Sequence, residues 1–119
     1  MKLKDLKLVY NAAAHFNAAE KYPDGLVAEL KKPNTESFEA LFWALAEMAK
    51  QGELVRRYMG ETPKKTPTAE EFKTILRPNQ INKVTQMVFE ELARGLGGTE
   101  DDEEIDLILV EFEKKTNDA

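Results

Sequence analysis

The chain has 119 residues, of which 42% are hydrophobic, and this suits one domain with a single core. Its net charge of -5 argues against binding nucleic acid through the phosphates, and the absence of cysteine excludes disulfide scaffolds and cysteine-ligated zinc. The longest apolar run, residues 41–46, is far shorter than the roughly 20 residues that cross a bilayer, and the N-terminus lacks the apolar run of a signal peptide, so we expect a cytoplasmic protein without a membrane partner.

The first predicted element is a short strand or extended arm over residues 3–10. In this stretch Leu6, Leu8 and Tyr10 occur at every second position, a period that is typical of extended chain. The period changes after Tyr10, and Asn11 can cap a helix there.

Two helices are expected next. In the first, Ala12, Phe16 and Ala19 share one face, which we expect to be buried. The turn-forming residues 22–25 end this helix, and a brief second helix follows over residues 26–30.

The longest predicted helix begins after Pro33 and ends at Gln51 and Gly52, and residues 53–59 are expected to form a separate short helix. Its apolar residues recur with helical spacing and form one stripe. They are Phe38, Leu41, Phe42, Leu45, Met48 and Ala49.

Trp43 lies outside that stripe. At 100° per residue it falls among Glu36, Glu39, Glu47 and Lys50, on the face expected to meet water. A tryptophan on a charged face either packs on a second surface of its own chain or contacts a partner, and the sequence leaves both alternatives open.

Residues 60–67 contain two prolines and no large apolar residue, which predicts a loop. Thr68 and Glu71 then have the spacing of a capping box, in which each side chain accepts a backbone N–H at the start of a helix. The apolar face of this short helix consists of Phe72, Ile75 and Leu76.

Another long helix is predicted from Asn79 to the glycine-rich residues 95–98. Its stripe consists of Ile81, Val84, Thr85, Val88 and Leu92. We expect Val84, Val88 and Leu92 to be buried together with the stripe of the preceding long helix.

Residues 99–119 are predicted to be an acidic linker followed by a C-terminal helix. Leu107 and Val110 lie on the side of this helix opposite its main apolar face, so the helix is either sandwiched or free to bind a partner. The sequence thus predicts a mainly α, small single-domain helical bundle. Residues 1–98 form its core with the N-terminal arm, and residues 99–119 belong to that domain or form a partner-binding tail.

No set of residues predicts catalysis, a cofactor or a metal. The single His15 has no second ligand at helical spacing, and the acidic residues 101–104 lack the central glycine and spaced oxygens of a calcium loop. Residues 95–99 lack the Lys-Ser/Thr pair of a phosphate loop. We therefore expect a protein that is not an enzyme.

The order of the segments carries a resemblance to a known family. The segments are LKLVYNAAAHFNAAEKY, then SFEALFWALAEMAKQGELV, then a polar loop and TAEEFKTIL, and finally DDEEIDLILVEFEKKT. Together they resemble the tail assembly chaperones of tailed bacteriophages and prophages, especially those of Gram-positive hosts. In that family a segment similar to "lrwlLaal.nQG" stands where residues 42–52 stand here, and the resemblance covers nearly the whole chain.

The resemblance implies a non-enzymatic helical adaptor in the cytoplasm of the bacterial host, absent from the mature virion. Such proteins bind and solubilise the tape-measure protein in multiple copies, so self-association is expected. They also recruit tail-tube subunits, in many cases through an extension made by ribosomal frameshifting.

Trp43, Leu107 and Val110 are the residues we expect to bind the partner, since they are apolar positions beside a charged surface. The alternative is a small acidic helical prophage protein that acts as a regulator or adaptor. A helix-turn-helix near Gly52 would fit a regulator, but the acidic charge counts against DNA binding.

Overall fold

The structure is a computed structural model, and it describes residues 2–33, 35–97, 110 and 114. Within these residues the chain is mainly helical and contains no strand. Five α-helices and two short 3-10 turns follow one another in the order η1 (Leu3–Asp5), α1 (Ala12–Lys21), α2 (Leu26–Leu30), α3 (Thr35–Tyr58), α4 (Ala69–Ile75), η2 (Pro78–Gln80) and α5 (Ile81–Leu96). The predicted fold class is confirmed, and none of the described helices is long and apolar enough to cross a membrane.

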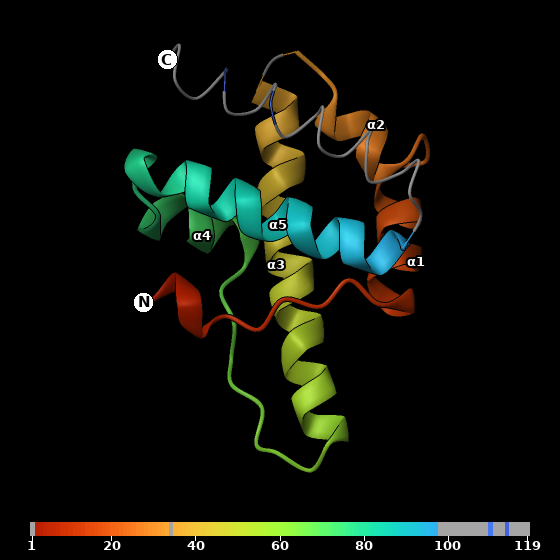
Figure 1. Ribbon diagram of the computed structural model, residues 1–119, viewed down its shortest axis with the longest axis vertical. Coiled ribbons are helices and arrows are strands. Elements are labelled where there is room, and N and C mark those ends of the chain that lie inside the picture. The colour runs from red at the N-terminus through yellow and green to blue at the C-terminus, as the bar shows by residue number, and fades with distance from the viewer. Residues whose placement is uncertain (1, 34, 98–109, 111–113, 115–119) are drawn as a thin grey trace.

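Helix α3 is the axis around which the other helices pack. It runs the length of the molecule in Figure 1, with α5 lying across it, and each of the other four helices contacts it. The predicted core is formed largely as expected, because all but one of its residues are buried and Phe38 packs against them half-buried. The buried members of that set are Leu41, Phe42, Leu45, Met48, Val84, Val88 and Leu92.

The N-terminal residues form an extended arm, and the strand that was its alternative does not form. After η1 the chain crosses α3 below α5 (Figure 1). The backbone N–H of Val9 donates to the carbonyl oxygen of Met48 at 3.1 Å, and that of Tyr10 donates to Oε1 of Glu91 at the same distance. The arm therefore forms hydrogen bonds to two helices. The alternation of apolar and polar residues in the arm arises because the chain is half-buried between helices, and not because it belongs to a sheet.

The predicted buried face of α1, with Ala12, Phe16 and Ala19, is wrong. Asn11 does cap the helix, its side chain accepting the N–H of Ala14 at 3.0 Å, but the buried residues are Ala14 and Ala18. Phe16 is 70% exposed. Two hydrogen bonds to α3, from Asn11 to Gln51 and from Asn17 to Glu47, turn the small alanines toward α3 and Phe16 away.

Gly52 does not end a helix, because α3 continues through it to Tyr58 as one helix of 24 residues. The arm passes directly over this glycine. A Cβ atom at position 52 would overlap the carbonyl oxygen of Lys7 and stand 2.7 Å from its carbonyl carbon. The glycine thus serves a close backbone approach inside a helix, a role that looks the same in sequence as a helix stop.

The second half of the chain follows the prediction more closely. Thr68 and Glu71 form the capping box at the start of α4. Gly97 ends α5 with a positive φ of 62°, which favours glycine. In α4, Phe72 is buried, but Ile75 is 48% exposed and faces away from the core.

We predict that Leu45→Ala lowers the free energy of unfolding by about 2–5 kcal/mol, because Leu45 is fully buried and the change leaves a cavity in the core. The same substitution at Leu54, which is 44% exposed on the same helix, should cost less than about 1 kcal/mol. Urea denaturation of the two variants gives both values. Equal losses would mean that the buried face of α3 is wrongly assigned.

A second prediction concerns Gly52→Ala, which we expect to lower the free energy of unfolding although the same change usually raises it inside a helix. In an open helix this change stabilises by about 1 kcal/mol. Here the added methyl group meets the backbone of Lys7, so we expect a net destabilisation of about 1–3 kcal/mol. Thermal unfolding followed by circular dichroism decides the sign, and a gain in stability would contradict the packing of the arm on α3.

Candidate functional site

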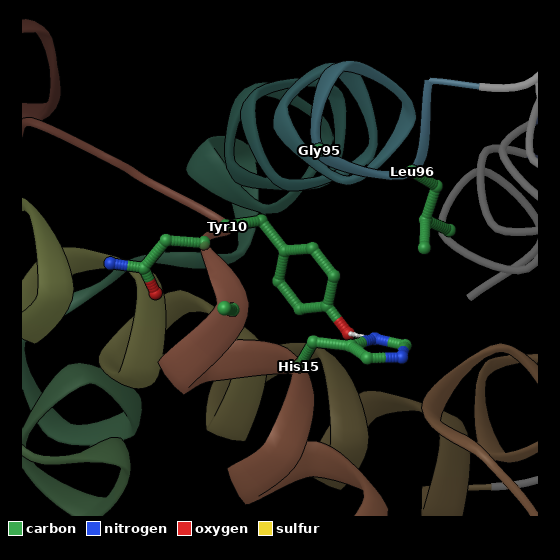
Figure 2. A pocket seen from close by; sticks show the side chains of 6 residues that line it. Tyr10, His15, Gly95 and Leu96 are labelled. Atoms are coloured by element: carbon green, nitrogen blue, oxygen red, sulfur yellow. Dashed lines mark hydrogen bonds between the residues drawn. The ribbon is translucent and has the colours of Figure 1, made fainter.

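One open depression lies where the arm meets α1 and α5 (Figure 2). It has a volume of about 380 Å³ and is lined by Tyr10, Asn11, Ala12, His15, Gly95 and Leu96. The hydroxyl of Tyr10 and Nδ1 of His15 form a hydrogen bond of 3.0 Å, and the two rings meet edge to face. Burial raises the pKa of the Tyr10 hydroxyl, so it stays protonated near neutral pH.

The lining of this depression suits packing better than chemistry. Its polar side chains are Tyr10, Asn11 and His15, and the Asn11 side chain already caps α1. Gly95 allows the close approach of the arm to α5, because a Cβ atom at position 95 would stand 2.5 Å from the carbonyl oxygen of Tyr10. In the described part of the chain, no group of three or more His, Cys, Asp or Glu side chains could hold a metal ion. The depression is mainly a result of the packing of the arm against α5.

Trp43 is half-buried by its own chain. It packs against the core, and its ring meets the ring of Tyr22 edge to face with the centroids 5.6 Å apart. Burial, followed by the charges of Glu29 and Glu39, raises the pKa of the Tyr22 hydroxyl. Of the two alternatives for Trp43, the structure thus displays the packing one, and its role as a partner contact stays a prediction.

The other two predicted contact residues lie in or beside the part of the chain that is not described. Val110 is described, and it is helical and 46% exposed. Leu107 lies outside the described residues. Their joint role also stays a prediction.

A more exposed surface lies on the second half of α3. Lys50, Leu54, Arg57 and Tyr58 are spaced i, i+4, i+7 and i+8, which places them on one face of the helix, and we call them the α3 stripe. All four are exposed, Leu54 by 44% and Tyr58 by 89%. Met59, 68% exposed, follows directly. Large apolar side chains at such exposure, between two cations, are typical of a surface that binds a partner.

The cations of the α3 stripe are available for such a partner. Among the described residues, neither Lys50 nor Arg57 forms an ion pair or a side-chain hydrogen bond. Arg56, next in sequence, is by contrast bound to Glu53 at 3.1 Å. The stripe thus combines two free positive charges with two exposed apolar side chains.

The loop that follows α3 is anchored by Glu53, which lies beside the α3 stripe. Glu53 is buried, and its Oε1 accepts the backbone N–H of Lys64 at 2.7 Å. Its Oε2 accepts from Nε of Arg56. Since Glu53 precedes Leu54 by one residue, it points about 100° away from it around the helix. In Figure 1 the loop returns along one side of α3, and Leu54 and Tyr58 stay exposed.

Sequence analysis missed the α3 stripe for one reason. The spacing of Lys50, Leu54, Arg57 and Tyr58 is visible in the sequence, but only if a single helix runs across Gly52. Ending the helix at Gly52 divided the pattern between two elements.

The chain matches no protein-family model, no curated protein and no solved structure.

Proposed function

We propose that this protein is a non-catalytic tail assembly chaperone that binds the phage tape-measure protein and keeps it soluble in the host cytoplasm. The observation that carries the proposal is the α3 stripe, an exposed apolar and basic helix face. The order of the sequence segments supports the choice of partner. Recruitment of tail-tube subunits belongs to the same proposal.

The α3 stripe is suited to a helical partner. A helix laid along α3 would cover Leu54 and Tyr58 with its apolar residues and place acidic residues near Lys50 and Arg57. A buried tyrosine contributes about 150–250 Å² of contact area. At about 25 cal/mol per Å² of apolar area, Tyr58 and Leu54 can each supply a few kcal/mol before the cost of association is subtracted.

This assignment moves the centre of the proposed contact from Trp43 to the second half of α3. Trp43 is half-buried against Tyr22, so a charged residue there would disturb the fold as well as any partner contact. Leu107 and Val110 stay as a second, untested contact.

We predict that the double variant Leu54→Glu, Tyr58→Glu folds like the parent but no longer keeps the tape-measure protein soluble on co-expression. Both side chains are exposed, so their replacement should change stability by less than about 1 kcal/mol. Losing both apolar contacts and adding charge should weaken binding roughly a hundredfold or more. The soluble fraction of the partner and its co-purification measure this.

Phe16→Glu is the matched control, because Phe16 is an exposed aromatic residue on a different helix. It should solubilise the partner as well as the parent does. If the double variant also does so, the α3 stripe is not the binding surface. If the parent itself never rescues the partner, the chaperone proposal fails.

A further inference from the structure

Basic side chains gather where the arm and the loop meet the second half of α3. Residues 2–7 and 50–65 contain eight basic and three acidic side chains, whereas residues 8–49 and 66–97 contain seven basic and ten acidic ones. The two basic segments lie together in the fold, because the carbonyl group of Lys7 passes over Gly52 where the arm crosses α3 (Figure 1). The chain is acidic as a whole, but this part of its surface is positive.

A cleft of about 210 Å³ opens between the start of the arm, α3 and the loop. Its charged lining residues are Lys2, Asp5, Glu53, Lys64 and Lys65. The three lysines are exposed, and within the described residues none of them forms an ion pair or a side-chain hydrogen bond. Three cations from two distant segments of the chain thus border one cleft.

Glu53 does not neutralise these lysines, because both of its oxygens are already bonded. Oε1 accepts the backbone N–H of Lys64, and Oε2 accepts from Nε of Arg56, whose charge balances that of the carboxylate. Asp5 is then the one other carboxylate that lines the cleft, against three lysines. This surplus of positive charge favours an anionic ligand.

The cleft adjoins the cations of the α3 stripe. Glu53 follows Lys50 by three residues and precedes Arg57 by four, so the side chains of both are its neighbours on the helix surface. Since Glu53 also lines the cleft, the positive surface continues from the cleft onto the stripe. Leu54 and Tyr58, exposed by 44% and 89%, lie next to these cations.

We propose that the cleft and the α3 stripe together bind an acidic, amphipathic segment of a protein partner. Carboxylates of that segment pair with Lys2, Lys64 and Lys65, and its apolar side chains cover the stripe. Leu54 favours a polypeptide over a nucleic acid, because a charged phosphate backbone cannot bury an aliphatic side chain. The inference rests on the proposed function for the use of the stripe, and it adds the charge of the partner and a second contact region.

The test is binding of a labelled peptide to the full chain, followed by fluorescence anisotropy. The peptide has about 20 residues, about 30 Å as a helix, with glutamate on one face and leucine on the other. The parent should bind it at low salt, and about 0.5 M salt should weaken binding at least about tenfold. The same peptide with glutamine in place of glutamate should also bind at least about tenfold more weakly.

The variant Lys64→Glu, Lys65→Glu tests the cleft itself. It should bind the acidic peptide at least about tenfold more weakly than the parent, because two attractive charges become repulsive. Glu53 keeps its bond in this variant, since its donor at position 64 is the backbone N–H. The matched control is Lys21→Glu, Lys83→Glu, which makes the same change in net charge at two exposed lysines outside the cleft and the stripe. It should bind within about twofold of the parent.

Four results would overturn the proposal. A parent that fails to bind the acidic peptide at about 1 mM is the first. The second is a cleft variant that binds like the parent, and the third is a control variant that loses as much affinity as the cleft variant. The fourth is tighter binding of a single-stranded RNA of about 20 nucleotides, which would make a nucleic acid the ligand.

Circular dichroism shows whether each variant folds. If Lys64→Glu, Lys65→Glu does not fold, Lys64→Gln, Lys65→Gln decides, and its undiminished affinity for the acidic peptide would overturn the proposal. The tape-measure protein takes no part in these measurements. If the peptide does not bind although the parent keeps the tape-measure protein soluble, this inference alone fails. If the peptide binds although the tape-measure protein is not rescued, the proposed function alone fails.

Discussion

The fold depends on a close approach of backbone to backbone at Gly52. The N-terminal arm can lie against α3 only because position 52 has no side chain, and a second glycine, Gly95, makes the same room on α5. Once seated, the arm donates the N–H of Val9 to α3 and that of Tyr10 to Glu91 of α5. The arm thus links the two longest helices, and Asn11 at its end caps α1.

The arm divides α3 into two halves that differ in burial. Above the arm, the helix is covered by α1, α2, α4 and α5, and Leu41 and Leu45 are wholly buried. Below it, Leu54 and Tyr58 remain exposed while Glu53 holds the returning loop. Buried packing is concentrated in one half and exposed apolar surface in the other, so substitutions in the α3 stripe should cost the fold little.

Much of the fold could be predicted from the sequence, because helical periodicity and capping are local. The stripe from Leu41 to Met48 and the Thr68–Glu71 capping box are such cases. The misassigned face of α1 depended on hydrogen bonds to residues about 30 to 40 positions away, which no local pattern reveals. The helix end predicted at Gly52 was wrong for a related reason. In sequence, a glycine that ends a helix cannot be told from one that makes room for a distant backbone segment. The α3 stripe could not be predicted for the same reason, because its residues lie on both sides of Gly52.

The bond between Glu53 and the backbone of Lys64 has a consequence for how freely the loop sequence can vary. The carboxylate binds a main-chain N–H, which every amino acid except proline possesses. Residues 61–67 could therefore exchange most of their side chains and keep the same anchorage, as long as Glu53 and a donor at position 64 remain. This loop is the natural place to insert an affinity tag or a fluorophore next to the α3 stripe without altering the helix that carries it.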